Sequence, residues 1–314
     1  MPKILVTGGA GFIGSSLAEK LSHKADNQII IVDNLLTGSI SKLPVAKHNN
    51  IRFIHADINV FEEISAVFLA NNFDYVFHYA ALVGVQRTQR QPLMVLNDIN
   101  GIRNVLALSK NTGVKRIYYA SSSEVYGEPA EFPQNEHTTP LNSRVPYAIV
   151  KNLGEAFLRS YNVEFGMEFT IFRFFNTYGP KQSVDFVISR FMSMALSNQD
   201  ITIFGDGSQT RTFCHIDDNI DATLNAFYEN QLINEVANIG NDHETTVLEL
   251  ANQIIALTGS SSQIVHLPAL LDGDMTRRKP DITKMKSLLN RPLLPLSDGL
   301  KRLLTDTRYI LPNV

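Results

Sequence analysis

The sequence predicts an α/β protein with a doubly wound parallel sheet in residues 1–179 and a smaller α+β lobe mainly in residues 180–314. Short apolar and β-branched runs alternate with segments of helical period through the first half, which is typical of a parallel sheet covered by helices. After about Gly179 this alternation loosens, which indicates a second and less regular lobe. We expect some segments of the second half to return to the first domain.

The expected elements follow one another in a regular order. Strands of the large sheet are expected at Ile4–Thr7, Ile29–Val32, Ile51–His55, Tyr75–His78, Val114–Ala120 and Phe169–Arg173. Helices between them are expected to begin near Asn59, Pro92 and Pro146, and proline is favoured in the first turn of a helix. The smaller lobe is expected to hold strands Ile201–Phe204 and Val236–Ile239 and helices Thr246–Leu257 and Asp281–Leu289.

Composition limits the possible classes of function. The 314 residues are 44% hydrophobic and 19% charged, which suffices for a large buried core. The net charge of -3 and the scattered basic residues give no basic field, so nucleic acid is not an expected partner. The single cysteine, Cys214, cannot form an internal disulfide, and no Cys or His spacing predicts a metal site. No apolar run approaches the roughly eighteen residues of a membrane span, so we expect no membrane association and a cytoplasmic protein.

A strand, a glycine turn and a helix follow one another in ILVTGGAGFIGSSLAEKL, residues 4–21. Gly9, Gly11 and Gly14 fit the spacing G-x-G-x-x-G, and Gly8, Gly11 and Gly14 fit G-x-x-G-x-x-G. Such glycines allow a tight turn and a close approach of the backbone to a pyrophosphate, whose charge the free amides of the helix N-terminus favour. The pattern predicts a dinucleotide site in a Rossmann domain, and a glycine turn without a ligand is the alternative.

Carboxylates after the second and third strands extend this site. Asp33 ends the second strand at the distance from Gly14 where a carboxylate accepts hydrogen bonds from both hydroxyls of an adenine ribose. Asn34 and the two leucines after it include no basic residue to meet a 2'-phosphate, so NAD is favoured over NADP. Asp57 and Ile58 are expected to flank the adenine, although an aspartate that caps the next helix has the same signature.

The segment VPYAIVKNLGEAFL predicts a catalytic pair. Pro146 fits the first turn of a helix, which places Tyr147 and Lys151 four residues apart on one face. A phenol ordinarily titrates near pH 10, and a neighbouring ammonium together with a nicotinamide cation favours the phenolate. We predict that Tyr147 takes a proton from a substrate hydroxyl and that Lys151 favours its ionised form. The spacing alone is common on amphipathic helices, so the prediction depends on the glycine turn and the hydroxyl run upstream.

The order of these motifs resembles the extended short-chain dehydrogenase/reductase family that modifies nucleotide sugars with NAD. The resemblance covers nearly the whole chain, through T-G-G-A-G-F-I-G, the pair Asp33 and Asn34, H-Y-A-A, S-S-S-E-V-Y-G, Y-x-x-x-K, F-N-T-Y-G-P and GDGSQTRTF. It implies further NAD contacts by Phe12, Ile13 and Ala80. It also implies oxidation of the sugar C4 hydroxyl, reaction of the 4-ketone and, usually, return of the hydride. The fate of the ketone separates epimerases, dehydratases and decarboxylases.

By this resemblance Ser122 hydrogen-bonds the C4 oxygen beside Tyr147. A ketone at C4 acidifies the proton on C5, and Glu124 is placed to remove it. We therefore lean toward 4,6-dehydratase or decarboxylase chemistry, since C4 epimerases of the family usually carry a small or neutral residue at this position. Ser123 stands where dehydratases of deoxythymidine-glucose have an acidic aspartate, which disfavours that enzyme, whereas a decarboxylase needs no acid there.

Two alternatives stay open at this branch. Glu124 is a plain structural carboxylate in the first, because carboxylates are common at strand ends. The second is a 4-epimerase of a UDP-hexose or UDP-N-acetylhexosamine, since the segment HYAALVGVQRTQRQPL is more similar to epimerases and dehydratases of N-acetylated sugars. The nucleotide and the sugar are left undecided by the sequence.

The resemblance assigns the nucleotide sugar to Asn176, Phe204, Arg211 and Arg278. Arg211 and Arg278 match arginines that hold a diphosphate, for which the guanidinium fork is suited, and Arg277 competes with Arg278 in register. Phe204 is expected to contact the base, with a core position as the alternative. His78 is expected to pack at a strand end and His215 to lie at the surface, so neither receives a catalytic role.

The family usually dimerises through two helices, which here begin near Pro92 and Pro146, so the resemblance implies a homodimer. Two other classes of protein compete with the enzyme. One is a non-catalytic NAD-binding protein, which would have no use for four residues at catalytic spacing. The other is a simple NAD-dependent alcohol dehydrogenase with an exchangeable cofactor, which would release NADH during turnover.

Overall fold

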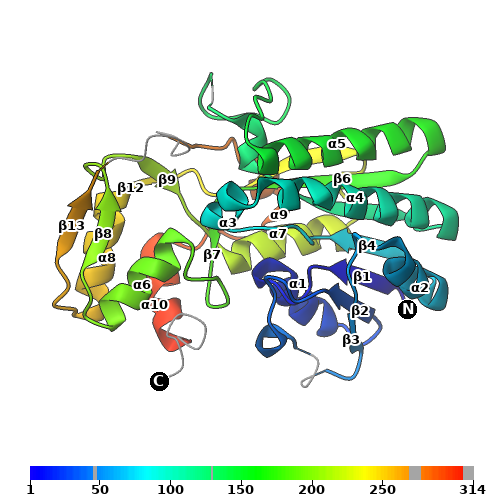
Figure 1. The fold of residues 1–314 in the computed structure, drawn as a ribbon, viewed down its shortest axis with the longest axis horizontal. Helices are drawn as coiled ribbons and strands as arrows, with labels where there is room; N and C mark the ends of the chain where they lie inside the picture. Colours follow the sequence, from blue (N-terminus) through cyan, green and yellow to red (C-terminus); the bar gives the residue numbers. More distant parts are fainter. Residues whose placement is uncertain (45–47, 129, 269–276, 307–314) are drawn as a thin grey trace. The chain divides into compact units, whose positions relative to one another are not determined.

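The computed structural model describes the chain except for residues 45–47, 129, 269–276 and 307–314, and except for the side chains of Val85 and Gln86 (Figure 1). The chain forms two compact units. The first consists of Met1–Val125, Leu141–Arg173 and Thr223–Ala237, and the second of Tyr126–Pro140, Phe174–Ala222 and Asn238–Val314. The chain passes between the units more than once. The sequence analysis placed the main boundary after residue 179 and expected some later segments to return to the first domain.

A seven-stranded sheet forms the centre of the first unit, with the strand order β11-β6-β5-β4-β1-β2-β3. Its strands are β1 Lys3–Thr7, β2 Gln28–Asp33, β3 Ile51–His55, β4 Tyr75–His78, β5 Arg116–Ser122, β6 Glu168–Phe174 and β11 Glu235–Ile239. The pairs β1 with β2, β1 with β4, β2 with β3, and β4 with β5 are parallel. The strand order changes direction at β1, and ligands of such sheets bind at the carboxyl ends of the strands near this switch point.

Helices of the first unit cover both faces of this sheet. They are α1 Phe12–Ser22, α2 Phe61–Asn71, α3 Val85–Arg90, α4 Pro92–Thr112, α5 Pro146–Phe165 and the end of α7 Ile216–Tyr228, with short 3-10 turns η1 Ile40–Lys42 and η3 Ser123–Tyr126. Helices α2, α4 and α5 pack on the face that carries Tyr119, and α4 runs beside α5 in Figure 1. On the opposite face Tyr118 stacks on Phe77 with ring centroids 4.6 Å apart and meets Phe227 of α7 edge-on. Successive residues of a strand point to opposite faces, so one strand serves both layers.

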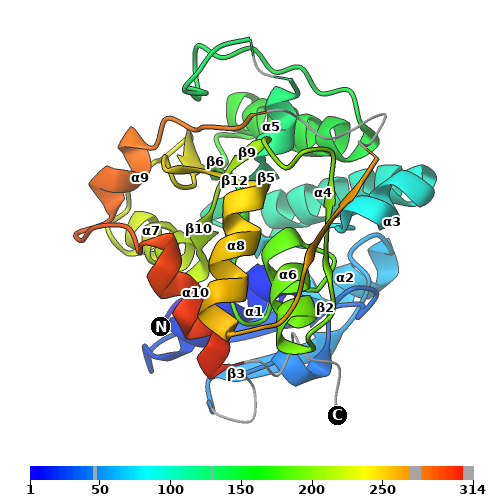
Figure 2. The ribbon, with the colours of Figure 1, turned by 90° about the vertical axis from the view of Figure 1, so that its left-hand side faces the viewer.

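The second unit is built from short strand pairs and helices (Figure 2). Its strands are β7 Thr177–Tyr178, β8 Ile201–Phe204, β9 Thr210–Thr212, β10 Cys214–His215, β12 Glu244–Thr246 and β13 Ile264–Leu267, paired as β7 with β10, β8 with β13 and β9 with β12. Its helices are α6 Val187–Leu196, α8 Val247–Thr258, α9 Thr283–Leu288 and α10 Leu296–Thr305, with the start of α7. Helix α8 packs against α6 and α10 around a core that includes Phe191, Leu250 and Leu300.

The parallel sheet confirms the α/β class, and two expected elements need correction. Residues 236–239, expected in the smaller lobe, belong to β11, which is the edge strand of the large sheet beside β6. The strand expected from Val114 begins at Arg116, because the backbone N–H of Val114 is still bonded to the carbonyl of Ser109 at the end of α4. None of the helices in the described ranges combines the length and the apolarity needed to cross a bilayer.

Candidate active site

The glycine turn lies between β1 and α1 at the carboxyl edge of the sheet. Gly8 has φ +69°, and a Cβ there would come within 2.6 Å of the Ala80 backbone, so the turn needs glycine for both reasons. A Cβ on Gly14 would collide with the Gly8 carbonyl. Gly11 is the N-cap of α1, which has no capping side chain and no acidic residue in its first turn. The first-turn amides, those of Phe12 and Ile13 among them, therefore favour an anion such as a pyrophosphate.

Asp33 lies at the end of β2, next to this turn. Its carboxylate accepts hydrogen bonds from the backbone N–H of Ala10 at 2.9 Å and of Leu35 at 2.8 Å. Burial raises the pKa of Asp33, while these two N–H groups oppose that shift. Each oxygen keeps a further lone pair, so the carboxylate can accept from ribose hydroxyls as well. The sequence analysis missed Gly38, where a Cβ would come within 2.7 Å of the carboxylate and crowd the site.

The structure brings together Asn34 and Asp57, which the sequence analysis assigned to the cofactor separately. The Asn34 amide donates to the Asp57 carboxylate at 2.9 Å, and that carboxylate also accepts from the backbone N–H of Asn59 at 2.8 Å. Asp57 thus caps a turn that precedes α2, which begins at Phe61 rather than near Asn59. Ile58 is buried, and its carbonyl accepts a hydrogen bond from Asn104 of α4.

His78 ends β4 inside the protein. Its Nδ1 lies 2.9 Å from the Thr7 hydroxyl, which also accepts from the backbone N–H of Ala80 at 3.3 Å. Burial, with a smaller contribution from Lys151, lowers the pKa of His78 to about 3. The imidazole is therefore neutral at neutral pH, and it fixes the backbone that leads to Ala80.

The hydroxyl run and Glu124 occupy the end of β5. Ser122 ends the strand, Ser123 and Glu124 begin η3, and the Glu124 backbone N–H donates to the Ser122 hydroxyl at 3.2 Å. The carbonyl of Val125 then accepts from the backbone N–H of Asn142 at 3.1 Å and from the hydroxyl of Ser143 at 3.0 Å. These bonds tie the segment that leads into α5 to the residue directly after Glu124.

Helix α5 carries the predicted pair. Pro146 occupies its first turn, and the Lys151 Nζ lies 5.8 Å from the ring centroid of Tyr147. The same ammonium group donates to the carbonyl of Ala120 at 2.6 Å, two residues before Ser122. Burial lowers the pKa of Lys151 to about 8. The structure therefore places Lys151 close to Tyr147 and to the last residues of β5, which ends at Ser122.

A buried salt bridge holds α5 on the sheet. Glu155 of α5 accepts two hydrogen bonds from the Arg173 guanidinium of β6, at 2.9 and 2.7 Å, and one from the Ser121 hydroxyl of β5 at 2.6 Å. Gly154 lets the helix approach closely, because a Cβ there would collide with the Tyr119 hydroxyl. These contacts fix the helix that carries Tyr147 against the strand that carries Ser122.

Four predicted sugar-binding residues lie in the second unit. The Asn176 amide donates to the carbonyl of Thr212 at 3.0 Å, directly after Arg211 on β9. Phe204 ends β8 half-buried. Arg278 is 8% exposed, whereas Arg277 is exposed and forms a salt bridge with Glu244 at 2.6 Å. Of the two competing arginines, Arg277 is therefore already paired at the surface.

His215 was expected at the surface and is instead 2% exposed, so that expectation is wrong. Its ring centroid lies 5.3 Å from that of Tyr178, and its Nδ1 lies 3.5 Å from the Asp217 carboxylate. Burial lowers the pKa of His215. His215 is therefore a packing residue. It ends β10, contacts Tyr178 of β7 and directly precedes α7. Within the described ranges no cluster of three or more His, Cys, Asp and Glu side chains is arranged to hold a metal ion.

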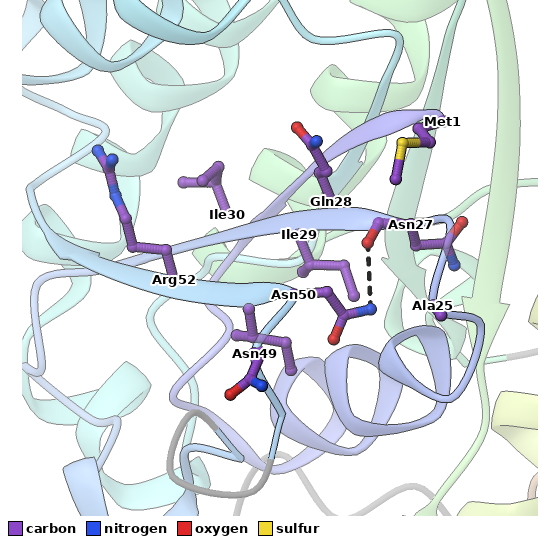
Figure 3. A pocket seen from close by; sticks show the side chains of 10 residues that line it. Met1, Ala25, Asn27, Gln28, Ile29, Ile30, Asn49, Asn50 and Arg52 are labelled. Carbon is purple, nitrogen blue, oxygen red and sulfur yellow. Dashed lines mark hydrogen bonds between the residues drawn. The ribbon is translucent and has the colours of Figure 1, made fainter.

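A hollow of about 290 Å³ lies at the opposite, amino edge of the sheet, where β2 and β3 begin (Figure 3). It is lined by Met1, Ala25 and residues 27–30 and 49–52. The Asn50 amide donates to the carbonyls of Ser22 and Asn27, both at 3.1 Å, and the Asn27 amide donates to that of Leu21. Both amides thus bind backbone carbonyls at and after the end of α1.

Known proteins match the chain over its length. The family model described as the NAD dependent epimerase/dehydratase family matches residues 4–240. The chain is 37% identical to a UDP-N-acetyl-alpha-D-glucosaminuronate decarboxylase of Bacillus cytotoxicus, over 98% of each chain. It superimposes with a TM-score of 0.90 and 34% identity on the UDP-glucose 4-epimerase of Thermotoga maritima, solved with UDP-glucose, over 98% of both. A UDP-glucuronic acid 4-epimerase of Bacillus cereus, solved with UDP-glucuronic acid and NAD, matches with a TM-score of 0.86 and 31% identity, again over 98% of both.

These matches confirm the resemblance inferred from the motifs. The glycine turn, the uncapped start of α1 and the accepting carboxylate of Asp33 fit NAD at the carboxyl edge of the sheet. The chain belongs to the NAD-dependent epimerase/dehydratase family and is an NAD-dependent enzyme of it.

Proposed function

We propose that this chain removes the carboxyl group of a UDP-linked uronic acid sugar by way of a 4-keto sugar. The proposal is carried by Glu124, which lies just after Ser122 at the end of β5. The next residue, Val125, accepts hydrogen bonds from Asn142 and Ser143, which precede α5 in the chain. The 37% identity to a decarboxylase of a UDP-linked uronic acid, over 98% of both chains, supports it.

In this proposal Tyr147, Ser122 and Lys151 act in the oxidation at C4, and Glu124 acts in the later step at C5. Bound NAD would supply the acceptor for the hydride from C4 of the sugar and the donor that returns it. Tyr147, as the phenolate, takes the proton of the C4 hydroxyl, and Ser122 holds the C4 oxygen. Lys151 supplies the positive charge that favours the phenolate. The positions of Ser122 and Tyr147 beside the substrate stay predictions.

The ketone at C4 makes the carboxyl group at C6 a leaving group. The C5–C6 bond breaks with its electron pair drawn into the ketone, and carbon dioxide departs without an acid at C6. This fits Ser123, whose hydroxyl is a poor acid. Glu124 in its protonated form then returns a proton to C5, and in a dehydration the same group, as the carboxylate, would remove that proton.

A UDP-hexose 4-epimerase is the second candidate, because the Thermotoga maritima epimerase superimposes on 98% of this chain with a TM-score of 0.90. An epimerase turns the ketone over and returns the hydride to the other face, which needs no group at C5. The two reactions are therefore separated by whether Glu124 is needed.

The product mass from a panel of nucleotide sugars tests the reaction class. We expect loss of carbon dioxide from UDP-glucuronic acid or its 2-acetamido analogue. Loss of water from UDP-, dTDP-, GDP- or CDP-hexoses would instead assign a dehydratase, and an isomer of unchanged mass from UDP-glucose or UDP-N-acetylglucosamine would assign the epimerase.

Two variants with matched controls test the residue roles. Glu124→Gln should lower product formation about 10²- to 10⁴-fold while enzyme-bound NADH still accumulates, because only the C5 step is blocked. Tyr147→Phe should abolish both signals. Glu128→Gln, which removes an exposed carboxylate a few positions further along the chain, and Tyr161→Phe, on the same helix as Tyr147, should keep full activity. Full activity of Glu124→Gln would contradict the decarboxylase and favour the epimerase.

We further propose a homodimer through α4 and α5. These helices pack side by side and carry exposed apolar side chains, namely Leu93 and Met94 on α4 and Ile149, Val163 and Phe165 on α5. Sedimentation of the purified chain tests this. The assignment of Asn176, Phe204, Arg211 and Arg278 to the nucleotide sugar stays a prediction, as does a cytoplasmic location.

A further inference from the structure

Glu244 of β12 binds two basic side chains of the segment 277–279, which lies in the same unit. Its carboxylate accepts hydrogen bonds from the Arg277 guanidinium at 2.6 and 2.8 Å and lies 3.4 Å from the Lys279 Nζ. The bonds from Arg277, with a smaller contribution from Lys279, lower the pKa of Glu244 to about 2, so this carboxylate is ionised at neutral pH. One carboxylate therefore holds two residues that lie two positions apart in the chain.

Arg278 lies between these two residues and is directed the other way. A parallel bridge between Pro280 and Gln134 indicates that the segment is extended, and successive side chains of an extended segment point to opposite sides. The burial follows this alternation. Arg278 is 8% exposed and Pro280 is buried. Arg277 is exposed and Lys279 is half-buried. The residues held by the carboxylate thus lie on one side of the segment and Arg278 on the other.

The salt bridge is the polar contact that fixes the start of this segment. The backbone of Gln134 bonds to the residues on both sides of Pro280, at 2.8 Å each, and neither bond reaches Arg277. Among the described residues the Arg277 side chain is hydrogen-bonded only to Glu244. Without this carboxylate the Arg277 side chain has no hydrogen-bonding partner within that part of the chain, and it can compete with Arg278 for an anion.

Glu244 also contacts the strand that carries the other predicted arginine. The Thr210 hydroxyl donates to its carboxylate at 3.2 Å, and Arg211 follows Thr210 on β9. β9 and β12 pair as antiparallel strands, with Arg211 opposite Thr245. The same carboxylate therefore contacts a neighbour of Arg211 and both neighbours of Arg278, the two arginines that we predict to hold a diphosphate.

We propose that Glu244 is a positioning residue for the nucleotide sugar: by holding the residues on both sides of Arg278, it presents that guanidinium, rather than the one of Arg277, to the diphosphate. The inference rests on the proposed function in one respect, that the ligand is a UDP-linked sugar whose diphosphate Arg278 binds. A guanidinium held in place before binding loses less conformational entropy when the ligand arrives, which tightens binding. The sequence analysis gave Glu244 no role and left the two arginines in competition.

Charge and positioning predict opposite effects of removing this carboxylate. Glu244 is an anion bonded to the neighbours of Arg278, so its charge alone repels a diphosphate, and Glu244→Gln would then strengthen binding. If Glu244 positions Arg278, the same variant weakens binding. The direction of the change therefore separates the two roles.

Calorimetric titration of the purified protein with UDP measures the effect without turnover. Arg278→Met should raise the dissociation constant for UDP about 10- to 100-fold, the effect of losing a hydrogen bond between charged groups. Glu244→Gln should raise it about 3- to 10-fold, because Arg278 is present but no longer held in place. Adding Arg277→Met to Glu244→Gln should change little, because Glu244 acts through Arg277. Glu244→Asp, which keeps a carboxylate, should return the affinity toward that of the unchanged protein.

Asp242→Asn is the matched control, because Asp242 lies two residues before Glu244 and forms an exposed salt bridge of 2.6 Å with Lys286. It should leave the dissociation constant for UDP unchanged within about twofold. With a reactive nucleotide sugar, Glu244→Gln should raise KM by the factor seen with UDP and leave kcat nearly unchanged, since an arginine on the diphosphate binds the ground state and the transition state alike. A merely structural loss would instead lower the fraction of folded enzyme, which lowers the apparent kcat and leaves KM as it is.

The outcomes separate this inference from the proposed function. Unchanged or tighter binding of UDP by Glu244→Gln overturns the inference, whichever sugar reacts, and so does unchanged binding by Arg278→Met. An equal loss in Asp242→Asn also overturns it, because the effect would then not be specific to Glu244. If UDP binding depends on Glu244 as expected but no sugar of the panel reacts, the proposed reaction fails and the inference stands. Absence of UDP binding by the unchanged protein overturns both.

Discussion

The salt bridge between Glu155 and Arg173 and the one between Glu244 and Arg277 have nearly the same length, 2.7 and 2.6 Å, in very different surroundings. The side chains of Glu155 and Arg173 are each 2% exposed, whereas those of Arg277 and Glu244 are 45% and 20% exposed. Water screens the exposed second pair much more than the buried first pair. The comparison indicates that burial, rather than distance, determines how much stability is lost when one partner of an ion pair is removed. Burial also determines how strongly a charge acts on neighbouring groups.

The buried pair also shapes the electrostatics of the candidate active site. Because Arg173 neutralises Glu155, the carboxylate nearest to Lys151 along α5 is not free to balance that amine. The exposed pair has no such consequence, since Arg277 lies at the surface over the ring of Phe132.

The largest effect is expected for Glu155→Gln, which removes the buried carboxylate that binds the Arg173 guanidinium. Breaking such a pair from one side costs about 3–5 kcal/mol in the free energy of unfolding, which urea denaturation measures. Replacing both partners, in Glu155→Gln with Arg173→Met, should recover most of this loss, because no charge then stays buried. A cost below about 1 kcal/mol for Glu155→Gln would break the comparison, since the buried pair would behave like a surface pair.

A smaller effect is expected for Ser121→Ala, which removes the hydroxyl that donates to Glu155 and leaves the ion pair in place. A hydrogen bond to a charged group contributes about 1.5–3 kcal/mol. The matched control is Ser109→Ala on α4, whose buried hydroxyl makes no hydrogen bond within the part of the chain that the structure describes. We expect the control to change the free energy of unfolding by less than Ser121→Ala does, and equal losses would show that the bond to Glu155 adds nothing.

Helices, strands and turns that depend on neighbouring residues could be predicted from the sequence. The burial of charged side chains whose partners are distant in the chain could not. The strands around the glycine turn are continuous apolar runs, and the glycines of the turn lie close together in the sequence. Both were therefore predicted with bounds nearly right. Arg116 is 2% exposed because Glu168 and Asn230, far away in the chain, bind its guanidinium. Nothing next to Arg116 in the sequence indicates such partners.

The same limit applies to the candidate site. Tyr147 and Lys151 were predictable because four residues along a helix make one face. His215 was expected at the surface, and its burial follows from packing that includes Tyr178 of another strand, which the local sequence does not indicate. β11 was assigned to the wrong lobe for a related reason, since strand neighbours are chosen by the whole fold rather than by the order of the chain.

The smallest effect is expected for Glu244→Gln at the exposed pair, about 1 kcal/mol or less at neutral pH. Arg277, with Lys279, holds the pKa of Glu244 down to about 2, against an ordinary value of 4.5. Because this pKa is lower in the folded than in the unfolded chain, the stabilisation is present above pH 4.5 and is lost as the pH falls toward 2. Urea denaturation at neutral pH and at about pH 3 should therefore show a small difference between the two proteins that shrinks on acidification and on addition of salt. A loss at Glu244 as large as that at Glu155 would mean that two pairs of equal length contribute equally, and burial would no longer explain the difference between them.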